Sequence, residues 1–264
     1  MRFVLGGSDT EMKAIQVLAM ELGHTVVLAQ KDGKRVTRGY AYDADYPKPK
    51  LGDIWVECQH KDYSKTEMFS LGVEVVDHHY EGDPGYGKPP AEYWEASSIG
   101  QVYELLDLEP TEKARFIAAG DHCLYAAYHS MCPGVDKKAF IEHRMAFFKK
   151  NKTEEAFDRK KKEVVDVAKS CKKITLGKLE LVDLTPVMES HSGWMSDVSC
   201  MLNLKFATIK PHKNKNWVKY FVGNLSRKEI RYFMEELVPT MGEVVTVYGD
   251  PTRQFAGAVI CLSE

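Results

Sequence analysis

The sequence predicts an α/β protein with a mostly parallel sheet in its N-terminal domain and a second, smaller α+β domain. In the first half of the chain, short apolar runs alternate with segments whose apolar residues recur at helical spacing, as in a parallel sheet covered by helices. Beyond a polar stretch at residues 149–155, candidate strands dominate instead. We therefore expect domains at 1–150 and 151–264, the second including a connecting helix.

The elements of the first domain begin with a strand, a turn and a helix. Residues 1–5 form an apolar run, and after two glycines the apolar spacing from Ile15 to Leu22 is that of a helix. Further strands are expected at 25–29, 53–57 and 72–76. Further helices are expected from Ser97, over 111–119 and over 136–149.

The elements of the second domain begin with a helix at 153–171, whose run of three lysines is expected to face solvent. Another helix is expected from Ser226 to about Leu237, because Ser226 and Glu229 have the spacing of a capping box. Strands are expected at 173–184, 198–204, 217–222, 243–248 and 256–262.

The composition argues against several classes of protein. A net charge of −2 is not that of a protein that coats nucleic acid. The six cysteines contain no CxxC pair, which disfavours a disulfide framework or a thiolate zinc site. No apolar run approaches the roughly 20 residues that cross a bilayer. We therefore expect a cytoplasmic protein with no membrane partner.

The most informative motif is Asp77-His78-His79, which directly follows an apolar run at residues 73–76. In an open α/β sheet, ligands bind at the carboxyl ends of the strands. Neutral imidazoles ligate metal ions, and a neighbouring carboxylate either binds the ion or orients a ligating ring. The motif therefore predicts a divalent metal site and favours a phosphoester substrate.

Four acidic residues stand at or near the ends of predicted strands and helices. Glu57 ends an apolar strand, so its carboxylate should be partly buried and need a partner such as a cation. Asp9 follows the first strand, but it also suits the start of a helix. Glu11 lies three residues after Ser8, the spacing of a capping box, so its role is open. Asp121 is either a ligand or an ordinary acid at a helix end.

In their order and spacing, these segments resemble the DHH phosphoesterase family, which includes RecJ-type exonucleases and phosphodiesterases of small oligonucleotides and cyclic dinucleotides. The resemblance covers most of the chain, including residues 249–258, which are similar to the glycine-rich segment of the DHH-associated domain. The segments that carry it in the first domain are Asp9-Thr10-Glu11, Glu57, Asp77-His78-His79, Ser97-Ser98-Ile99-Gly100 and Asp121.

The resemblance implies a hydrolase that uses one or two Mn²⁺ or Mg²⁺ ions to promote in-line attack of water on phosphorus. Its substrate would be a nucleotide, a dinucleotide or a short oligonucleotide, with inorganic pyrophosphate the weaker option. The oligomeric state is left open, a homodimer included. The implied metal ligands are Asp9, Glu11, Glu57, His78 and Asp121; the implied catalytic residues are Asp77, His78 and His79; the implied substrate-binding residues are His79, Arg253 and Gly257.

Two departures from the family pattern support a rival interpretation. Leu5 stands where the family has a metal-binding histidine, and Glu11 and Glu57 stand where aspartate is usual. Either His60 or His122, each close in sequence to a predicted ligand, could replace the missing imidazole. The rival is a non-catalytic nucleotide-binding or regulatory protein on a degenerate DHH scaffold.

A basic and aromatic segment at residues 205–220 has two interpretations. Its lysines alternate with Trp217 and Tyr220, an arrangement that can hold phosphates while bases stack on the rings. Alternatively, it is a lysine-rich turn before a strand whose aromatic side chains face the core. Arg253 is the better phosphate candidate, because it lies between two glycines where the backbone can approach a ligand closely.

Overall fold

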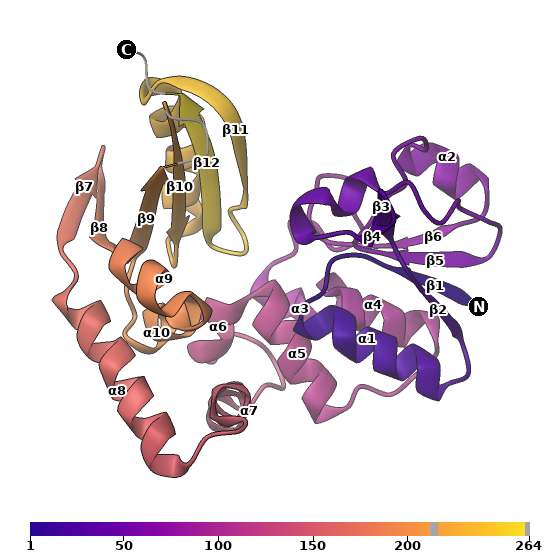
Figure 1. Cartoon of the computed structure of the whole chain (residues 1–264), viewed down its shortest axis with the longest axis horizontal. Helices are drawn as coiled ribbons and strands as arrows, with labels where there is room; N and C mark the ends of the chain where they lie inside the picture. The colour runs from indigo at the N-terminus through magenta and orange to yellow at the C-terminus, as the bar shows by residue number, and fades with distance from the viewer. Residues whose placement is uncertain (212–215, 262–264) are drawn as a thin grey trace. The chain divides into compact units, whose positions relative to one another are not determined.

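The computed structural model describes residues 1–211 and 216–261, and the chain divides into two compact units. Unit 1 comprises Met1–His122 and Cys132–Val135, and unit 2 comprises Cys123–Met131 and Asp136–Glu264. Figure 1 draws the strands of unit 1 in indigo to magenta and those of unit 2 in salmon to yellow. The α/β fold class is confirmed. No helix among the described residues has the length and apolarity that crossing a bilayer requires.

Unit 1 is built on a four-stranded parallel sheet in the order β2-β1-β5-β6. All four strands match the predicted runs, and β5 is buried along its whole length. A strand buried on both faces reads as a continuous apolar run rather than an alternating one. The strands are β1 (Arg2–Leu5), β2 (Thr25–Leu28), β5 (Asp53–Val56) and β6 (Glu74–Val76).

Helices cover both faces of this sheet, with α1, α4 and α5 on one side and α2 on the other (Figure 1). The side that carries α2 buries Val4, Trp55, Met68 and Val75 in one cluster. The further elements of unit 1 are α1 (Thr10–Glu21), β3 (Gln30–Lys31), β4 (Lys34–Arg35), η1 (Arg38–Asp43), α2 (Lys65–Ser70), η2 (Pro90–Glu92), α3 (Tyr93–Ala96), α4 (Ser98–Leu105) and α5 (Glu112–His122).

Unit 2 contains a six-stranded sheet in the order β11-β12-β10-β9-β8-β7, antiparallel except for the parallel pair β8 and β9. Its strands are β7 (Lys173–Leu176), β8 (Leu179–Asp183), β9 (Phe206–Pro211), β10 (Trp217–Gly223), β11 (Glu243–Asp250) and β12 (Phe255–Cys261). Its helices are α6 (Leu124–Tyr128), α7 (Lys137–Lys149), α8 (Glu154–Ser170), α9 (Thr185–His191), η3 (Ser192–Trp194), α10 (Met195–Met201), α11 (Arg227–Arg231), η4 (Tyr232–Leu237) and η5 (Val238–Thr240).

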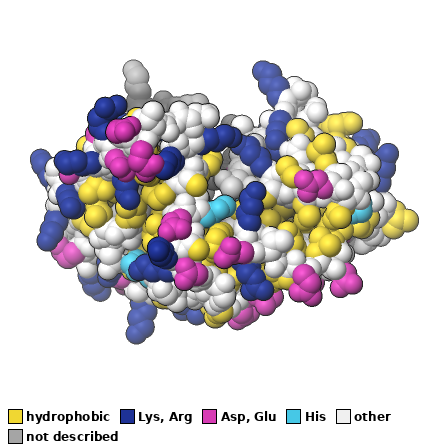
Figure 2. Space-filling view, turned by 90° about the horizontal axis from the view of Figure 1, so that it is seen from below, with side chains coloured by type: hydrophobic (Ala, Val, Ile, Leu, Met, Phe, Trp, Pro, Cys, Tyr) yellow, Lys and Arg dark blue, Asp and Glu magenta, His cyan; other side chains and the backbone are white. Residues whose placement is uncertain are grey.

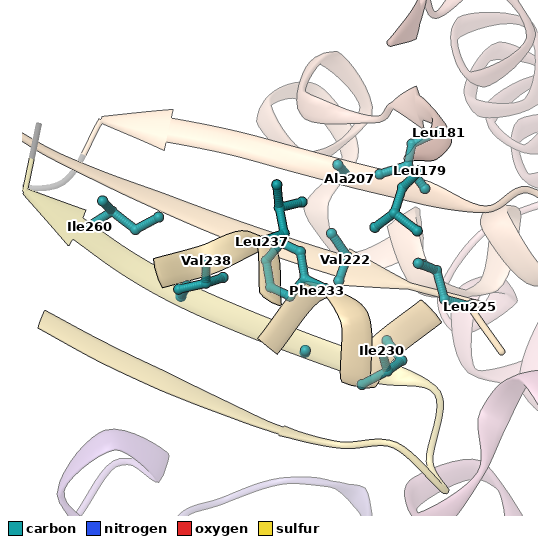
Figure 3. Close-up of a cluster of buried hydrophobic side chains, with 12 residues drawn as sticks. Leu179, Leu181, Ala207, Val222, Leu225, Ile230, Phe233, Leu237, Val238 and Ile260 are labelled. Atoms are coloured by element: carbon teal, nitrogen blue, oxygen red, sulfur yellow. The ribbon is translucent and has the colours of Figure 1, made fainter. Parts of the chain in front are cut away.

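One face of the unit 2 sheet is covered by α11 and η4. Figure 3 shows Ile230, Phe233 and Leu237 of this helical segment directed at Val222 and Ile260 of the strands. The predicted capping box starts the segment: the Ser226 hydroxyl accepts from the Glu229 backbone N–H, and the Glu229 carboxylate accepts in return. Because side chains alternate along a strand, the neighbours of Val222 point to the opposite face of the sheet.

The strand predicted at 198–204 is wrong, because residues 195–201 form helix α10 and the next strand, β9, begins only at Phe206. Met195 and Val198 lie one helical turn apart and are both buried in the cluster that contains Trp194. A short apolar run of this kind fits a buried strand and a buried helix equally well, so tertiary packing decides. Helix α9 was also not anticipated.

The surface carries charges of both signs. On the face drawn in Figure 2, basic side chains are scattered among acidic and apolar ones and form no continuous basic field over the described residues. This distribution agrees with the net charge of −2.

Candidate metal centre

The candidate site lies where three parallel strands end together. Leu5 of β1 pairs with Val56 of β5, which in turn pairs with Val76 of β6. The residues that follow the second and third of these strands are Glu57 and the Asp77-His78-His79 motif. Parallel strands bring their carboxyl ends to one edge of the sheet, so residues 20 positions apart become neighbours there.

Four side chains converge at this edge: Glu11, Glu57, His78 and Asp121, called here the tetrad. Each offers one possible ligand atom, and these atoms all lie within 4.8 Å of one another. Nε2 of His78 is 3.2 Å from Oδ2 of Asp121 and 3.6 Å from Oε1 of Glu57. An overlapping group joins Glu57 and His78 to His79. The structure thus brings four of the five predicted ligands together.

The fifth predicted ligand, Asp9, lies outside both groups. Its carboxylate caps α1 by accepting the Met12 backbone N–H at 2.7 Å. The capping-box alternative, with Ser8 as the N-cap and Glu11 reaching back to it, is wrong. Glu11 instead accepts the Ile99 backbone N–H at 2.9 Å. Metal ligation by Asp9 stays a prediction.

The serine-rich start of α4 supplies the hydrogen bonds that hold the two glutamates. Ser97 caps the helix, the Ser98 hydroxyl donates to Oε1 of Glu57 at 2.8 Å, and Ile99 donates to Glu11. Oε2 of Glu11 has no hydrogen-bond partner among the described residues, although Glu11 is only 1% exposed. A buried carboxylate oxygen of this kind requires a cation or a proton.

Burial also perturbs the acids of the tetrad. It raises the pKa of Glu57 to about 7; the charge of His79 opposes this rise, and the charges of Asp121 and Asp9 add to it. Burial, together with the charges of Asp121 and Glu57, raises the pKa of Glu11 well above its ordinary value. Three carboxylates crowded around one imidazole therefore repel one another unless a positive charge joins them. A hard divalent cation, which prefers oxygen ligands and accepts imidazole, fits this donor set.

Asp77 orients His79. The Asp77 carboxylate is fully buried, lies 2.9 Å from Nδ1 of His79, and accepts the Tyr42 hydroxyl at 2.9 Å. Burial alone would raise the pKa of Asp77, but the hydrogen bond and charge of His79 hold it below its usual value. Asp77 therefore stays ionised and fixes the orientation of the His79 ring through Nδ1. No sequence pattern had pointed to Tyr42.

Neither of the two histidines considered as a replacement ligand joins the tetrad. Nε2 of His60 lies 3.2 Å from the Asp45 carbonyl, and its Nδ1 accepts the Asp62 backbone N–H. Nδ1 of His122 lies 3.4 Å from Nδ1 of His78, on the side of that ring opposite to Nε2. Leu5, at the position of the family's histidine, is a fully buried core residue.

The backbone at the site depends on a close approach between Gly6 and Glu57. Glu57 has φ +49°, in the left-handed region that a side chain rarely adopts. A Cβ on Gly6 would lie 2.3 Å from the Glu57 carbonyl oxygen. Gly6 therefore leaves the space in which the Glu57 peptide is held.

Replacing Gly6 by Ala should force these two strand ends apart. We expect the unfolding free energy to fall by about 1 to 3 kcal/mol, and Mn²⁺ affinity to fall because Glu57 is displaced. Urea denaturation and calorimetric Mn²⁺ titration measure the two effects. Gly193→Ala is the control, since a Cβ there meets nothing within 4 Å. A Gly6→Ala protein that binds Mn²⁺ as the native protein does would contradict the prediction.

The affinity for a cation should rise with pH up to about 7. The pKa of Glu57 is about 7, so below that pH the ion must displace a proton from the carboxyl group. We expect Mn²⁺ affinity to increase about tenfold per pH unit for each proton displaced, and to level off above this range. Calorimetry in buffers of different ionisation enthalpy counts the protons. A flat profile from about pH 5.5 to about pH 8 would be the contrary result.

Unit 2 has a pocket of about 250 Å³ on the sheet face opposite α11. Its walls are Phe221, Tyr248, Thr208 and methionines of α9 and α10, with Lys210 and Lys219 beside them. The two lysines are direct cross-strand partners. Tyr220 packs against the core, as expected from the interpretation of segment 205–220 as a turn before a strand whose aromatic side chains face inward. Phe221, the next residue, lines the pocket on the other face. The part of the segment at 212–215 lies outside the described residues.

The two predicted substrate-binding residues of unit 2 lie near the β11–β12 turn. Gly257 makes room for a pocket wall, since a Cβ there would lie 2.2 Å from the Tyr248 ring. Arg253 stands in the turn itself, with its guanidinium 5.3 Å from the centre of the Phe255 ring. It is not among the residues that line the pocket.

The chain is similar in fold to a solved structure of known activity. No protein-family model matches the chain, and no curated protein does. Among solved structures, the chain is similar to PggH, a pGpG-specific phosphodiesterase from Vibrio cholerae, with a TM-score of 0.50 and 15% sequence identity. The match covers 98% of this chain and 93% of that one, so the likeness of fold extends over nearly the whole sequence.

Proposed function

We propose that this protein is a divalent-metal-dependent phosphoesterase of the DHH type. It hydrolyses a phosphodiester or phosphomonoester of a nucleotide, a dinucleotide or a short oligonucleotide. The observation that carries the proposal is the tetrad, in which three carboxylates and one imidazole from four separate elements converge at the carboxyl edge of the sheet. The shared fold with a pGpG-specific phosphodiesterase supports it.

The residues of the tetrad would hold Mn²⁺ or Mg²⁺, one ion or two. When bound, such an ion neutralises charge on a phosphate and makes water more acidic. Glu57 and His78 belong to both groups of ligand atoms, and Glu57 is the carboxylate of the two, so it would contribute negative charge to an ion held by either group. Glu11 and Asp121 supply further oxygens, and His78 supplies Nε2.

His79 is the residue that would act on the substrate. Its side chain is 37% exposed, unlike the buried His78. Nδ1 is engaged by the Asp77 carboxylate, which stabilises the protonated ring. The protonated ring donates from Nε2, either to a phosphate oxygen or to the leaving oxygen as its bond to phosphorus breaks. Asp77 thus acts through His79 rather than on the substrate.

The pocket in unit 2 supports a nucleotide as the substrate class. Lys210 and Lys219 are like charges directly opposite each other on neighbouring strands, an arrangement that an anion relieves. Phe221 and Tyr248 offer aromatic surface against which a base can stack. We propose that Arg253 binds a phosphate of the substrate. Gly257 has no side chain, and this leaves the space that the Tyr248 ring occupies in the pocket wall.

A non-catalytic nucleotide-binding or regulatory protein is the second candidate. The observation that favours it is Leu5, which is buried in the core where a second ion would need an imidazole. Asp9 is also occupied with capping α1. A site reduced to one ion could retain nucleotide binding and lose hydrolysis.

The two candidates separate in one experiment. Metal-stripped protein is given Mn²⁺ or Mg²⁺ and assayed with pGpG, a nucleoside 3′,5′-bisphosphate and pyrophosphate. His78→Ala is the test variant, and His24→Ala is the control, because His24 precedes β2 at the opposite edge of the sheet. Metal-dependent turnover of a nucleotide that disappears only in His78→Ala supports the enzyme. Nucleotide binding without turnover supports the regulatory protein, and failure to bind either ion overturns both metal assignments.

A further inference from the structure

We propose that His122 is a positioning residue that fixes the tautomer of His78, so that Nε2 of His78 faces the tetrad with its lone pair. The role of the ion in this inference rests on the proposed function. The tautomer itself follows from hydrogen bonds within the protein and can be tested without an ion. His122 ends α5, directly after the tetrad residue Asp121.

The first step establishes which ring nitrogen of His122 carries the hydrogen. Its ring is 1% exposed, and Nε2 lies 3.0 Å from the backbone carbonyl oxygen of Lys88. A carbonyl oxygen only accepts hydrogen bonds, so Nε2 of His122 must carry a hydrogen and donate it. In the neutral ring, Nδ1 is then the acceptor.

The second step passes this constraint to His78. Nδ1 of His122 and Nδ1 of His78 are 3.4 Å apart, and the ring centres are 5.5 Å apart. Two lone pairs cannot face each other at this distance in a buried site, so one nitrogen must donate. Because Nδ1 of His122 is the acceptor, Nδ1 of His78 carries the hydrogen. Its Nε2 therefore presents a lone pair toward Asp121 and Glu57.

The third step considers the other tautomer of His78, with its hydrogen on Nε2, which these hydrogen bonds disfavour. In that tautomer, His78 would present the Nε2 hydrogen to the tetrad, where Oδ2 of Asp121 lies 3.2 Å away. That form cannot ligate a cation, because the nitrogen that faces the tetrad is protonated. Metal-binding histidines are commonly held by an acceptor on the nitrogen remote from the metal, and loss of it typically costs about 10- to 100-fold in affinity. Here a second buried histidine serves as that acceptor.

The fold offers a matched control for His122. His60 is also 1% exposed, and its Nε2 likewise faces a backbone carbonyl, that of Asp45, at 3.2 Å. Its Nδ1 accepts a backbone N–H from Asp62 instead of a ring N–H from His78. His60→Phe and His122→Phe each remove from a buried ring one hydrogen bond to a backbone carbonyl and one hydrogen bond accepted by Nδ1. Only His122→Phe removes a contact with a tetrad residue.

The test combines metal affinity with the spectrum of the histidines. Mn²⁺ affinity is measured by calorimetry at about pH 8 for all variants. We expect His122→Phe to lower it about 10- to 100-fold and His60→Phe to leave it unchanged. In ¹⁵N spectra of metal-free protein, we expect His78 to carry its hydrogen on Nδ1 in the native chain and to populate the Nε2-protonated form in His122→Phe.

The inference is overturned if native His78 is protonated on Nε2 without metal, or if His122→Phe binds Mn²⁺ at native strength. If His122→Phe does not fold, His122→Gln replaces it, because its amide oxygen still accepts and should restore most of the affinity. If the native protein binds no ion, the proposed function fails. The ¹⁵N spectrum of the metal-free native chain then still decides the tautomer.

Discussion

Replacing Glu57 by Gln should abolish metal-dependent hydrolysis. Among the described residues, Glu57 is one of the two that belong to both groups of ligand atoms, and it is the carboxylate of the two. The substitution removes the negative charge and one of the two carboxylate oxygens that would hold an ion, and we expect kcat/KM to fall by about a thousandfold or more, equivalent to about 4 kcal/mol of transition-state stabilisation. Calorimetry should show Mn²⁺ affinity falling together with activity.

The same substitution should stabilise the metal-free protein at high pH. The pKa of Glu57 in the folded protein is about 7, raised chiefly by burial above its ordinary value. Below the ordinary value, the carboxyl group is protonated in both states and costs nothing. As pH rises through about 7, the folded state resists ionisation and loses about 3 kcal/mol of stability relative to the unfolded chain. Gln does not ionise, and its oxygen still accepts from Ser98.

Urea denaturation with a chelator present checks this pH dependence. Native protein and Glu57→Gln should have similar stability near pH 4, and the variant should be the more stable one near pH 8, by up to about 3 kcal/mol. A variant that is less stable at high pH, or that binds Mn²⁺ normally, would show that Glu57 is a structural residue rather than a ligand.

The largest loss of stability is expected in unit 2 for Asp197→Ala. The Asp197 carboxylate is 1% exposed and accepts two hydrogen bonds from Arg144, at 2.8 and 2.7 Å, and one from Tyr128 at 2.8 Å. Removing it leaves the partly buried Arg144 guanidinium without its counter-charge and the buried Tyr128 hydroxyl without its acceptor, which together cost about 3 to 5 kcal/mol. Chemical denaturation followed by circular dichroism measures the loss.

A double variant serves as the control for this pair. Arg144→Met combined with Asp197→Leu removes both charges and fills the space with apolar atoms, so it should be far more stable than Asp197→Ala alone. If the double variant is as unstable as the single one, the pair contributes through its shape and the hydrogen bond to Tyr128, rather than through an uncompensated charge.

Much of the fold follows from the sequence because unit 1 is regular. The strands that lead to Glu57 and Asp77 are short apolar runs between helical segments, and this pattern has one simple interpretation. Residues 198–204 do not behave this way. Val198 and its neighbours are equally apolar on a strand or on a helix face, and contact with Trp194 selects the helix. The spacing of apolar residues around Val198 does not reveal that contact.

Some residues of the candidate site can likewise be identified from local sequence, and others only from the folded structure. Glu57, His78 and Asp121 can be selected from the sequence because strand and helix ends place them and the motif spacing groups them. Glu11 is selected as a ligand only through the resemblance, because its spacing from Ser8 fits a helix cap as well as a ligand. Tyr42 and His122 act through contacts with Asp77 and His78 that are distant in sequence, and only the folded chain brings them together.

Under the proposed function, the three crowded acids of the tetrad make the cation a partner in folding as well as in catalysis. An ion that binds only the native chain stabilises it according to its free concentration, by about 2.7 kcal/mol at a hundredfold excess over Kd. A shortage of metal would therefore reduce the amount of folded protein together with its turnover, since unfolded chains are open to proteases. Cellular abundance of this protein should follow the supply of its ion.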